Sequence, residues 1–295
     1  HAIFLSLPKP RGKKSSMKKI LPKAGEIHHL KPGICRLTAP NAGLMTGPGT
    51  NTYILGEKEF GIIDPGPHID RHIQKILEFT QGNISWILVT HTHQDHSPAV
   101  SSLAKTSGAE VLGIPPPLDG HQDMTFQPDR ELKEGELLTT KEFELTVIHT
   151  PGHASNHLCY LGTQHKWLFT GDHIMDGSTV VINPPDGSMR EYLNSMHKLT
   201  EKTIKAIAPG HGAIIDNPYE VIDWIIKHRL KREKKVLKSL KENPNLKLSE
   251  LVELAYNDVN KSIYPLAERS LLAHLIKLSE DNLARNHNDR WEMIN

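Results

Sequence analysis

The run from position 91 to position 96 constrains this chain more than any other feature, because it contains three histidines and one aspartate. It follows Ile84–Thr90, an apolar and β-branched segment that predicts a buried strand. Side chains two positions apart in an extended segment point to the same side, so the first two histidines can hold one metal ion. The aspartate and the last histidine lie beyond the turn and can face a second ion. These four residues are His91, His93, Asp95 and His96.

Mixed ligands of this kind have a recognisable chemistry. Zinc prefers imidazole nitrogen and carboxylate oxygen in such combinations. A surface loop that is rich in histidine by chance is the alternative, but it rarely places this pattern directly behind a strand. The segment therefore predicts a metal site on a loop at the end of a core strand.

Three later turns repeat the pattern of an apolar strand that ends in a histidine or an aspartate. The strands predicted before them are Phe143–Ile148, Trp167–Thr170 and Ile204–Ala208. Glycine or proline beside each turn permits a sharp exit from the strand, which would bring the side chains to one edge of a sheet. Each residue alone could be an ordinary turn residue, but together they predict one site. They are His153, Asp172 and His211.

The seven residues divide between two metal ions. The first ion would take His91, His93 and His153, and the second would take Asp95, His96 and His211, with Asp172 as the bridge. Metal ions that share a bridging ligand lie about 3.5–4 Å apart, and they lower the pKa of bound water from 15.7 to about 7, so hydroxide forms at neutral pH. No serine or cysteine nucleophile is then needed. Asp95 is predicted to hold and deprotonate the attacking water, and to pass a proton to the leaving group.

Two features upstream of the site leave alternatives open. Asp64 ends the predicted strand Phe60–Asp64 and precedes Pro65-Gly66. A carboxylate there could orient a metal-binding histidine or could simply begin a Pro-Gly turn. The Gly- and Pro-containing segment Gly43–Asn51 is either a mobile flap or a tight connection.

Composition excludes several classes of protein. The chain is 37% hydrophobic and 23% charged, which is typical of a soluble globular protein. Its net charge of +1 argues against a general polyanion binder, and no apolar run approaches the roughly 20 residues of a membrane span. Cys35 and Cys159, its two cysteines, give no disulfide framework and favour a reducing, cytoplasmic location.

The domain organisation is predicted from breaks in the sequence pattern. Met17, before Lys18-Lys19, is compatible with a natural start, so residues 1–24 are predicted to be an extension outside the fold. Residues 25–217 would form the metal-binding domain. Residues 218–295 would contain the long helix Pro218–Lys241 and a small helical module of winged-helix type, with helices over Leu248–Tyr256 and Pro265–Leu278.

The metal-binding residues resemble the hallmark of the metallo-β-lactamase superfamily. The resemblance rests on H-x-H-x-D-H at 91–96, Pro151-Gly-His153, Gly171-Asp172 and Pro209-Gly-His211. It implies an α+β fold, an αββα sandwich with a dinuclear site at one edge. Asp64 matches an early aspartate of the family, which favours its role in orienting a ligand.

Further segments resemble the β-lactamase-like-protein-2 subfamily. They are Gly49-Thr-Asn-Thr-Tyr53, Gly177-Ser-Thr-Val180, His228-Arg-Leu-Lys-Arg232, Glu250-Leu-Val252 and Ala273-His-Leu-Ile-Lys-Leu278. This resemblance implies a winged-helix-like C-terminal domain and an endoribonuclease acting on single-stranded RNA. The stretch Lys227–Lys241 carries eight Lys or Arg against one Glu, which suits a phosphate backbone or a solvated helix face. No aromatic-rich platform for stacking bases is evident.

Other functions fit the same ligands. A small-molecule carbonyl substrate, such as a β-lactam, a thioester or a lactone, requires a compact pocket with an apolar wall, whereas RNA requires a basic groove. Another alternative is a metal-binding interaction protein whose winged-helix module docks a partner. Loss of a metal ligand would favour it, whereas this chain has all of the ligands. Iron-dependent sulfur dioxygenases of the superfamily use one iron and lack the ligands of a second metal ion. This chain has those ligands in Asp95, His96 and His211. The prediction is therefore a hydrolase with two Zn²⁺ per chain, Mn²⁺ or iron being less favoured; the oligomeric state is left open.

Overall fold

A computed structural model describes residues 21–294 of the chain. The prediction for the extension falls mostly on residues 1–20, which lie outside the described residues. The described chain divides into two compact units that interleave along the sequence. The first contains residues up to Thr150, 156–178 and 202–218, and the second contains 151–155, 179–201 and 219 onward.

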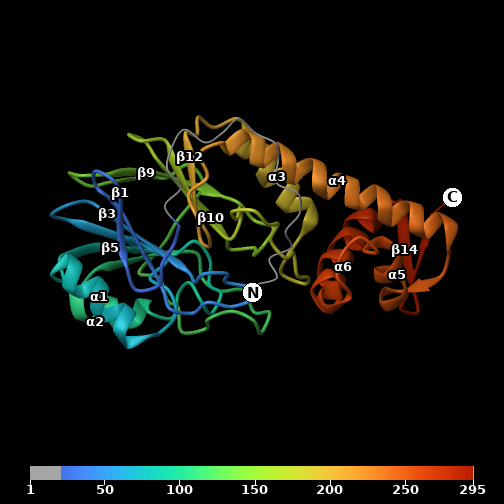
Figure 1. The fold of residues 1–295 in the computed structure, drawn as a ribbon, viewed down its shortest axis with the longest axis horizontal. Coiled ribbons are helices and arrows are strands. Elements are labelled where there is room, and N and C mark those ends of the chain that lie inside the picture. The colour runs from blue at the N-terminus through green and yellow to red at the C-terminus, as the bar shows by residue number, and fades with distance from the viewer. Residues whose placement is uncertain (1–20, 295) are drawn as a thin grey trace. The chain divides into compact units, whose positions relative to one another are not determined.

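Two β-sheets form the framework of the first unit (Figure 1). The seven-stranded sheet runs in the order β1 (Ile27–Lys31), β2 (Ile34–Thr38), β3 (Asn51–Leu55), β4 (Phe60–Ile63), β5 (Ile84–Leu88), β6 (Glu110–Gly113) and β7 (Arg130–Glu131). The five-stranded sheet runs in the order β12 (Ala206–Pro209), β11 (Trp167–Gly171), β10 (Leu158–Gly162), β9 (Glu144–His149) and β8 (Leu137–Thr139). The α+β class predicted from the sequence is confirmed.

The direction of the strands follows the expected pattern. Strands β1 to β4 pair antiparallel, as predicted for strands this close in sequence. Strands β4, β5 and β6 pair parallel, because helices α1 (Asp70–Thr80) and α2 (Val100–Ser107) connect them. The parallel arrangement places the carboxyl ends of β4 and β5 at the same edge, where Asp64 and the histidine run follow.

Apolar side chains on each face of the seven-stranded sheet form a separate core. One core lies between the two sheets and includes Tyr53, Leu88 and Phe169. The other packs the opposite face of the seven-stranded sheet against α1 and α2, through residues such as Ile76 and Leu103 (Figure 1). Because this sheet is covered on both faces, every residue of β2, β3 and β4 is buried, including polar ones such as Arg36 and Asn51.

The polar segment 115–136 is more ordered than its composition suggests. Phe126 and Leu132 are buried, and β7 pairs parallel with β6. Backbone hydrogen bonds from Asp123, Asp129 and Leu132 also hold the segment against the sheet and the histidine loop. His121 on this segment is exposed.

The second unit contains four α-helices and a small sheet. The helices are α3 (Met189–Thr200), α4 (Pro218–Glu242, from Tyr219 onward in this unit), α5 (Leu248–Ala255) and α6 (Tyr264–Glu280), with a 3₁₀ turn at Lys261–Ile263. The sheet has the order β13 (Leu246–Lys247), β15 (Arg290–Met293) and β14 (Ala284–His287). Helices α4, α5 and α6 share a core with β15, in which Leu251, Leu271 and Trp291 are buried. The sequence analysis predicted the helices but not the three strands.

Candidate metal centre

The histidine run leaves the end of β5 and turns inward. The His91 and His93 rings have centroids 4.6 Å apart, and those of His91 and His96 are 4.2 Å apart. His91 and His96 are buried, whereas 26% of the Asp95 side chain is exposed. His93 is also partly exposed, so the loop buries His91 and His96 and leaves His93 and Asp95 accessible from the surface.

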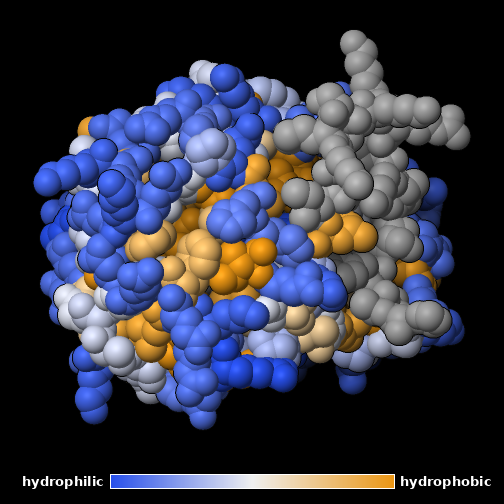
Figure 2. Space-filling view, turned by 60° about the vertical axis from the view of Figure 1, so that its left-hand side comes forward, coloured by the Kyte–Doolittle hydropathy of each residue, from blue (hydrophilic) through white to orange (hydrophobic). Residues whose placement is uncertain are grey.

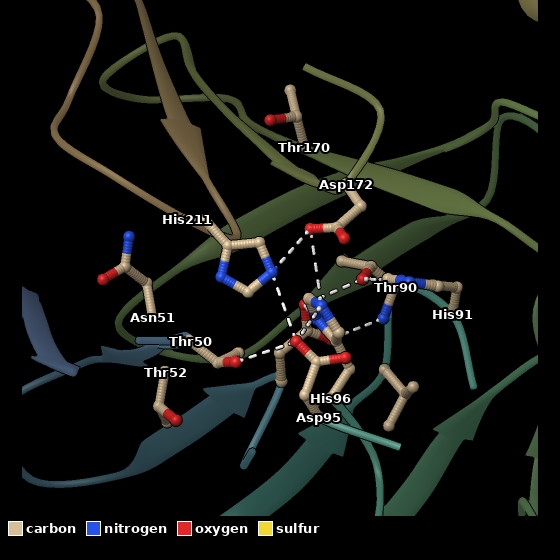
Figure 3. A network of polar contacts seen from close by, with 12 residues as sticks. Thr50, Asn51, Thr52, Thr90, His91, Asp95, His96, Thr170, Asp172 and His211 are labelled. Atoms are coloured by element: carbon tan, nitrogen blue, oxygen red, sulfur yellow. Dashed lines mark hydrogen bonds and ion pairs between the residues drawn. The ribbon is translucent and has the colours of Figure 1, made fainter. Parts of the chain in front are cut away.

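Asp172 and His211 arrive from the other sheet, at the ends of β11 and β12. The Nε2 atom of His211 lies 3.2 Å from Oδ2 of Asp95 and 3.2 Å from Oδ1 of Asp172 (Figure 3). The Nε2 atom of His96 lies 3.4 Å from the same two oxygens. Two imidazole nitrogens and two carboxylate oxygens therefore converge on one small volume, and the ligand atoms of Asp95, His96 and His211 all lie within 4.8 Å of one another.

This convergence fits a cation. The Nδ1 atom of His96 donates to the carboxylate of Asp64, so its Nε2 is the atom that faces Asp95 and Asp172. Burial opposes protonation of His96, but the neighbouring carboxylates raise its pKa well above the usual value, so a proton on Nε2 supplies positive charge between them when no metal ion is bound. A metal ion can take the place of this proton, because it binds the deprotonated imidazole and the carboxylates together. Zinc, which takes imidazole and carboxylate ligands, meets this requirement.

Gly210 keeps the space for these ligands open. A Cβ atom at this position would lie 2.8 Å from Oδ1 of Asp172 and 2.9 Å from Cε1 of His96. Both contacts are too short, so any side chain here would displace a ligand. The glycine that precedes His211 is therefore required by the site, and not only by the turn.

Asp64 lies directly behind His96 and contacts it. Its Oδ2 accepts a hydrogen bond from Nδ1 of His96 at 2.9 Å, and its two oxygens accept from the backbone N and the Oγ1 of Thr90, both at 2.7 Å. Asp64 is 2% exposed. A buried carboxylate held by two donors on one residue can hold the histidine in one orientation and one tautomer.

The segment Gly49–Asn51 supports the second set of ligands, a role that the sequence analysis did not assign. The Oγ1 of Thr50 donates to Oδ2 of Asp95 at 3.0 Å (Figure 3). The Nδ1 of His211 donates to the carbonyl of Gly49 at 3.2 Å. Asn51 donates to the carbonyls of Pro209 and Gly212. The base of the preceding loop is closed by the side chain of Asn41, which donates to Oγ1 of Thr50 and accepts from its backbone N.

His153 lies on the five-residue turn 151–155, which belongs to the second unit. Its Nδ1 donates to the carbonyl of Val181 at 2.7 Å, which leaves Nε2 as the ligand atom. Its place beside His91 and His93 in the first set stays a prediction from the sequence.

Comparison with known proteins decides the family. The sequence pattern of the metallo-β-lactamase superfamily matches residues 45–211, which include all the predicted ligands. The chain belongs to the metallo-β-lactamase superfamily. Residues 248–291 match the β-lactamase-associated winged helix domain, which accounts for α5, α6 and the small sheet.

The metallo-β-lactamase relatives resemble the chain over most of its length. The β-lactamase-like protein 2 homolog of Drosophila melanogaster is 30% identical over 88% of this chain and 92% of its own. The atrochrysone carboxyl ACP thioesterase AacuM of Aspergillus aculeatus is 27% identical over 88% of this chain and 85% of its own. The crystal structure of a β-lactamase domain protein from Burkholderia ambifaria aligns with a TM-score of 0.79 at 19% identity, over 92% of this chain and 95% of that one.

Charges within the metallo-β-lactamase site are strongly coupled. Burial alone would raise the pKa values of Asp95 and Asp172, but His96 and His211 hold them well below the usual range. Burial opposes protonation of His211, yet the two carboxylates raise its pKa to about 10. His91 differs, because burial and its neighbouring histidines lower its pKa well below the usual value. His91 is thus neutral, which is the form that binds a metal.

A cleft at the opposite edge of the metallo-β-lactamase sandwich is separate from this site. It has a volume of about 510 Å³, and Gly56, Phe143 and Trp167 are among the residues that line it. Strand β11 begins at Trp167 and ends at Gly171 beside Asp172, so the cleft and the ligands lie at opposite ends of the same strand. Figure 2, which looks onto the left-hand side of Figure 1, shows apolar side chains gathered within a polar surface.

The described residues contain no helix that is long and apolar enough to cross a membrane.

Proposed function

We propose that this metallo-β-lactamase-superfamily chain is a hydrolase that uses two zinc ions and cleaves phosphodiester bonds of single-stranded RNA. The observation that supports hydrolysis is the convergence of Asp95, Asp172, His96 and His211 at 3.2–3.4 Å. Three of these side chains are almost fully enclosed, and Asp95 is the most exposed of the four.

The protein groups have distinct roles in this proposal. Bound zinc would supply a Lewis acid and lower the pKa of water at the site. Asp95 faces solvent with its carboxylate fixed by Thr50, so it can hold a water molecule and accept its proton. Asp64 and Gly49 fix the Nδ1 protons of His96 and His211, which leaves both Nε2 atoms directed at the centre.

RNA is proposed from the β-lactamase-like-protein-2 resemblance and from the surface of α4. The structure corrects the expectation for the basic stretch: two of its eight basic residues, Arg229 and Arg232, are buried and bind carbonyl groups of the protein. The exposed remainder consists of lysines, which bind phosphate as point charges. They include Lys227, Lys231, Lys234, Lys238 and Lys241.

A thioester is the second candidate substrate. The observation that favours it is the similarity to a protein named as an acyl-carrier-protein thioesterase over 88% of this chain. The same ligands can polarise a carbonyl oxygen or a phosphoryl oxygen, so the site alone serves both reactions.

The experiment compares both substrates with one set of proteins. Zinc-loaded protein is assayed for cleavage of an end-labelled single-stranded RNA and for thiol release from an acyl-pantetheine thioester. Asp95→Asn keeps the size of the side chain and removes its basicity, and His197→Ala is the control because His197 is an exposed histidine on α3 that is not a predicted ligand. RNA cleavage that is lost in Asp95→Asn and kept in His197→Ala supports the proposal. Thiol release with no RNA cleavage selects the thioester, and no turnover of either substrate by zinc-replete protein overturns both.

A further inference from the structure

Two arginines one turn apart on α4 are buried in the second unit. Arg229 is 3% exposed and Arg232 is 5% exposed. Burial of a guanidinium costs free energy unless its charge and donors are satisfied. Arg232 is satisfied within the winged-helix part, where it bonds to Asp258 and lies 4.1 Å from the ring centroid of Tyr256. Arg229 has a different set of partners.

Arg229 holds the segment that follows Asp176. Its Nη2 donates to the carbonyl of Val180, and its guanidinium lies 5.4 Å from the ring centroid of Tyr192 on α3. A charged donor bound to a carbonyl forms a strong hydrogen bond in a buried setting. The position of Val180 is therefore tied to α4.

The next residue on this segment contacts a predicted metal ligand. The carbonyl of Val181 accepts a hydrogen bond from Nδ1 of His153 at 2.7 Å. A carbonyl can only accept, so Nδ1 carries the proton and the lone pair is on Nε2. If Val181 moved, the imidazole of His153 would lose the contact that fixes both its tautomer and its ring orientation.

The turn that carries His153 is held from α3. Ser195 donates to the carbonyl of Pro151, and the backbone N of Ser188 donates to the carbonyl of Gly152, both at 2.8 Å. Gly152 packs so closely on Tyr192 that a Cβ there would lie 2.4 Å from the Cα of Tyr192. Tyr192 thus contacts both the turn and the guanidinium of Arg229.

We propose that Arg229 is a positioning residue, which acts through Val180 and Val181 to fix His153 as a metal ligand. The inference rests on the proposed function, because it takes His153 as a ligand of the first metal ion. Helix α6 contributes as well, since Ser270 accepts a hydrogen bond from the backbone N of Ile182 at 3.4 Å.

The test measures zinc affinity and the histidine tautomer, without relying on activity. Arg229→Lys keeps the charge and shortens the reach, and Arg232→Lys is the matched control because it changes a buried arginine of the same helix. Zinc binding is measured by competition with a chromophoric chelator, and Nδ1 protonation of His153 by NMR of ¹⁵N-histidine-labelled protein. Arg229→Lys is expected to weaken one of two zinc ions about 10- to 100-fold, as for other groups that orient a ligand. Arg232→Lys is expected to leave both affinities unchanged.

A double-mutant cycle separates this inference from the proposed function. His153→Ala should weaken the same zinc ion, and adding Arg229→Lys to it should cause no further loss. If His153→Ala leaves both affinities unchanged, the ligand assignment itself is wrong. If His153→Ala weakens zinc binding and Arg229→Lys does not, only the role of Arg229 is overturned. Should Arg229→Lys fail to fold, Ser270→Ala takes its place: it removes the hydroxyl on α6 that accepts from the backbone N of Ile182, and an unchanged zinc affinity and an unchanged Nδ1 protonation of His153 would refute the inference that this segment fixes His153.

Discussion

Replacing Asp64 by asparagine tests the tie between the buried carboxylate and His96. In Asp64→Asn the oxygen that accepts from the backbone N of Thr90 can be kept, but an NH₂ group then faces Nδ1 of His96. Two donors cannot share this contact, so the imidazole would move its proton to Nε2 or turn away. Either change removes the lone pair that His96 directs at the second metal ion.

The size of the effect follows from these contacts. Loss of a group that orients a ligand lowers metal affinity about 10- to 100-fold, or about 1.4–2.7 kcal/mol. Loss of a charged hydrogen-bond acceptor in the interior also costs about 1.5–3 kcal/mol of folding stability. The zinc affinity and the stability of zinc-free protein therefore have to be measured separately, by chelator competition and by urea unfolding.

Asp123→Asn supplies the matched control. Asp123 is 3% exposed and accepts from the Oγ of Ser97 and from the N and Oγ1 of Thr125, at 2.5–3.0 Å. Like Asp64 it is a buried carboxylate with three bonds, but none of them comes from a histidine. Both variants should lose stability, and only Asp64→Asn should lose zinc affinity. Equal zinc affinities in Asp64→Asn and unmodified protein would refute the orienting role.

Three further predictions concern pH, glycine and metal. Burial lowers the pKa of His72 to about 4, below the 6.5 of an unfolded histidine, so its stabilising contribution is complete above pH 6.5 and is lost as the pH falls toward 4. Between pH 6.5 and 4, the free energy of unfolding should fall by about 3 kcal/mol less in His72→Gln than in unmodified protein. Parallel curves of unfolding free energy against pH would contradict this. Gly210→Ala should bind less zinc because its Cβ would press on Asp172, whereas Gly162→Ala, where the nearest atom is 3.6 Å away, should bind zinc normally; equal zinc content in the two would exclude steric crowding. Chelation should lower the thermal midpoint of unfolding, and added zinc should restore it, because zinc at a thousandfold excess over Kd adds about 4 kcal/mol to the free energy of unfolding. A midpoint that chelator does not change in calorimetry would argue against a structural contribution of the metal.

The strands that carry the ligands were predictable because the local signals agree. The ligand cluster at 91–96 and the three later ligands each follow an apolar run, and a glycine comes directly before His153, Asp172 and His211. Strands β10 and β11 pair antiparallel and strands β4, β5 and β6 pair parallel, as their short and helical connections respectively favour.

The supporting residues were not predictable, because their partners lie far away in the sequence. Asn51 bonds to the carbonyl of Pro209, 158 positions away, and Arg229 bonds to that of Val180, 49 positions away. Backbone carbonyls have no sequence signature. Arg229 and Arg232 were counted among the surface charges of the basic stretch, but both are buried. The number of charges along a helix does not say which residues face the core. Strands of two residues, such as β7 and β13, are too short to show a period.

The long-range closure between Asn51 and Pro209 has a consequence for the newly made protein. A nascent chain has β3, β5 and Asp95 well before β12 and His211 leave the ribosome. Until then Asp95 and His96 lack their third partner, and the carbonyls that receive Asn51 do not exist. Contacts of such high sequence separation form slowly and late. In the proposed two-zinc site, the set of ligands that includes His211 would therefore be complete only once the whole domain has been made, and a chain that stalls before Pro209 would lack it.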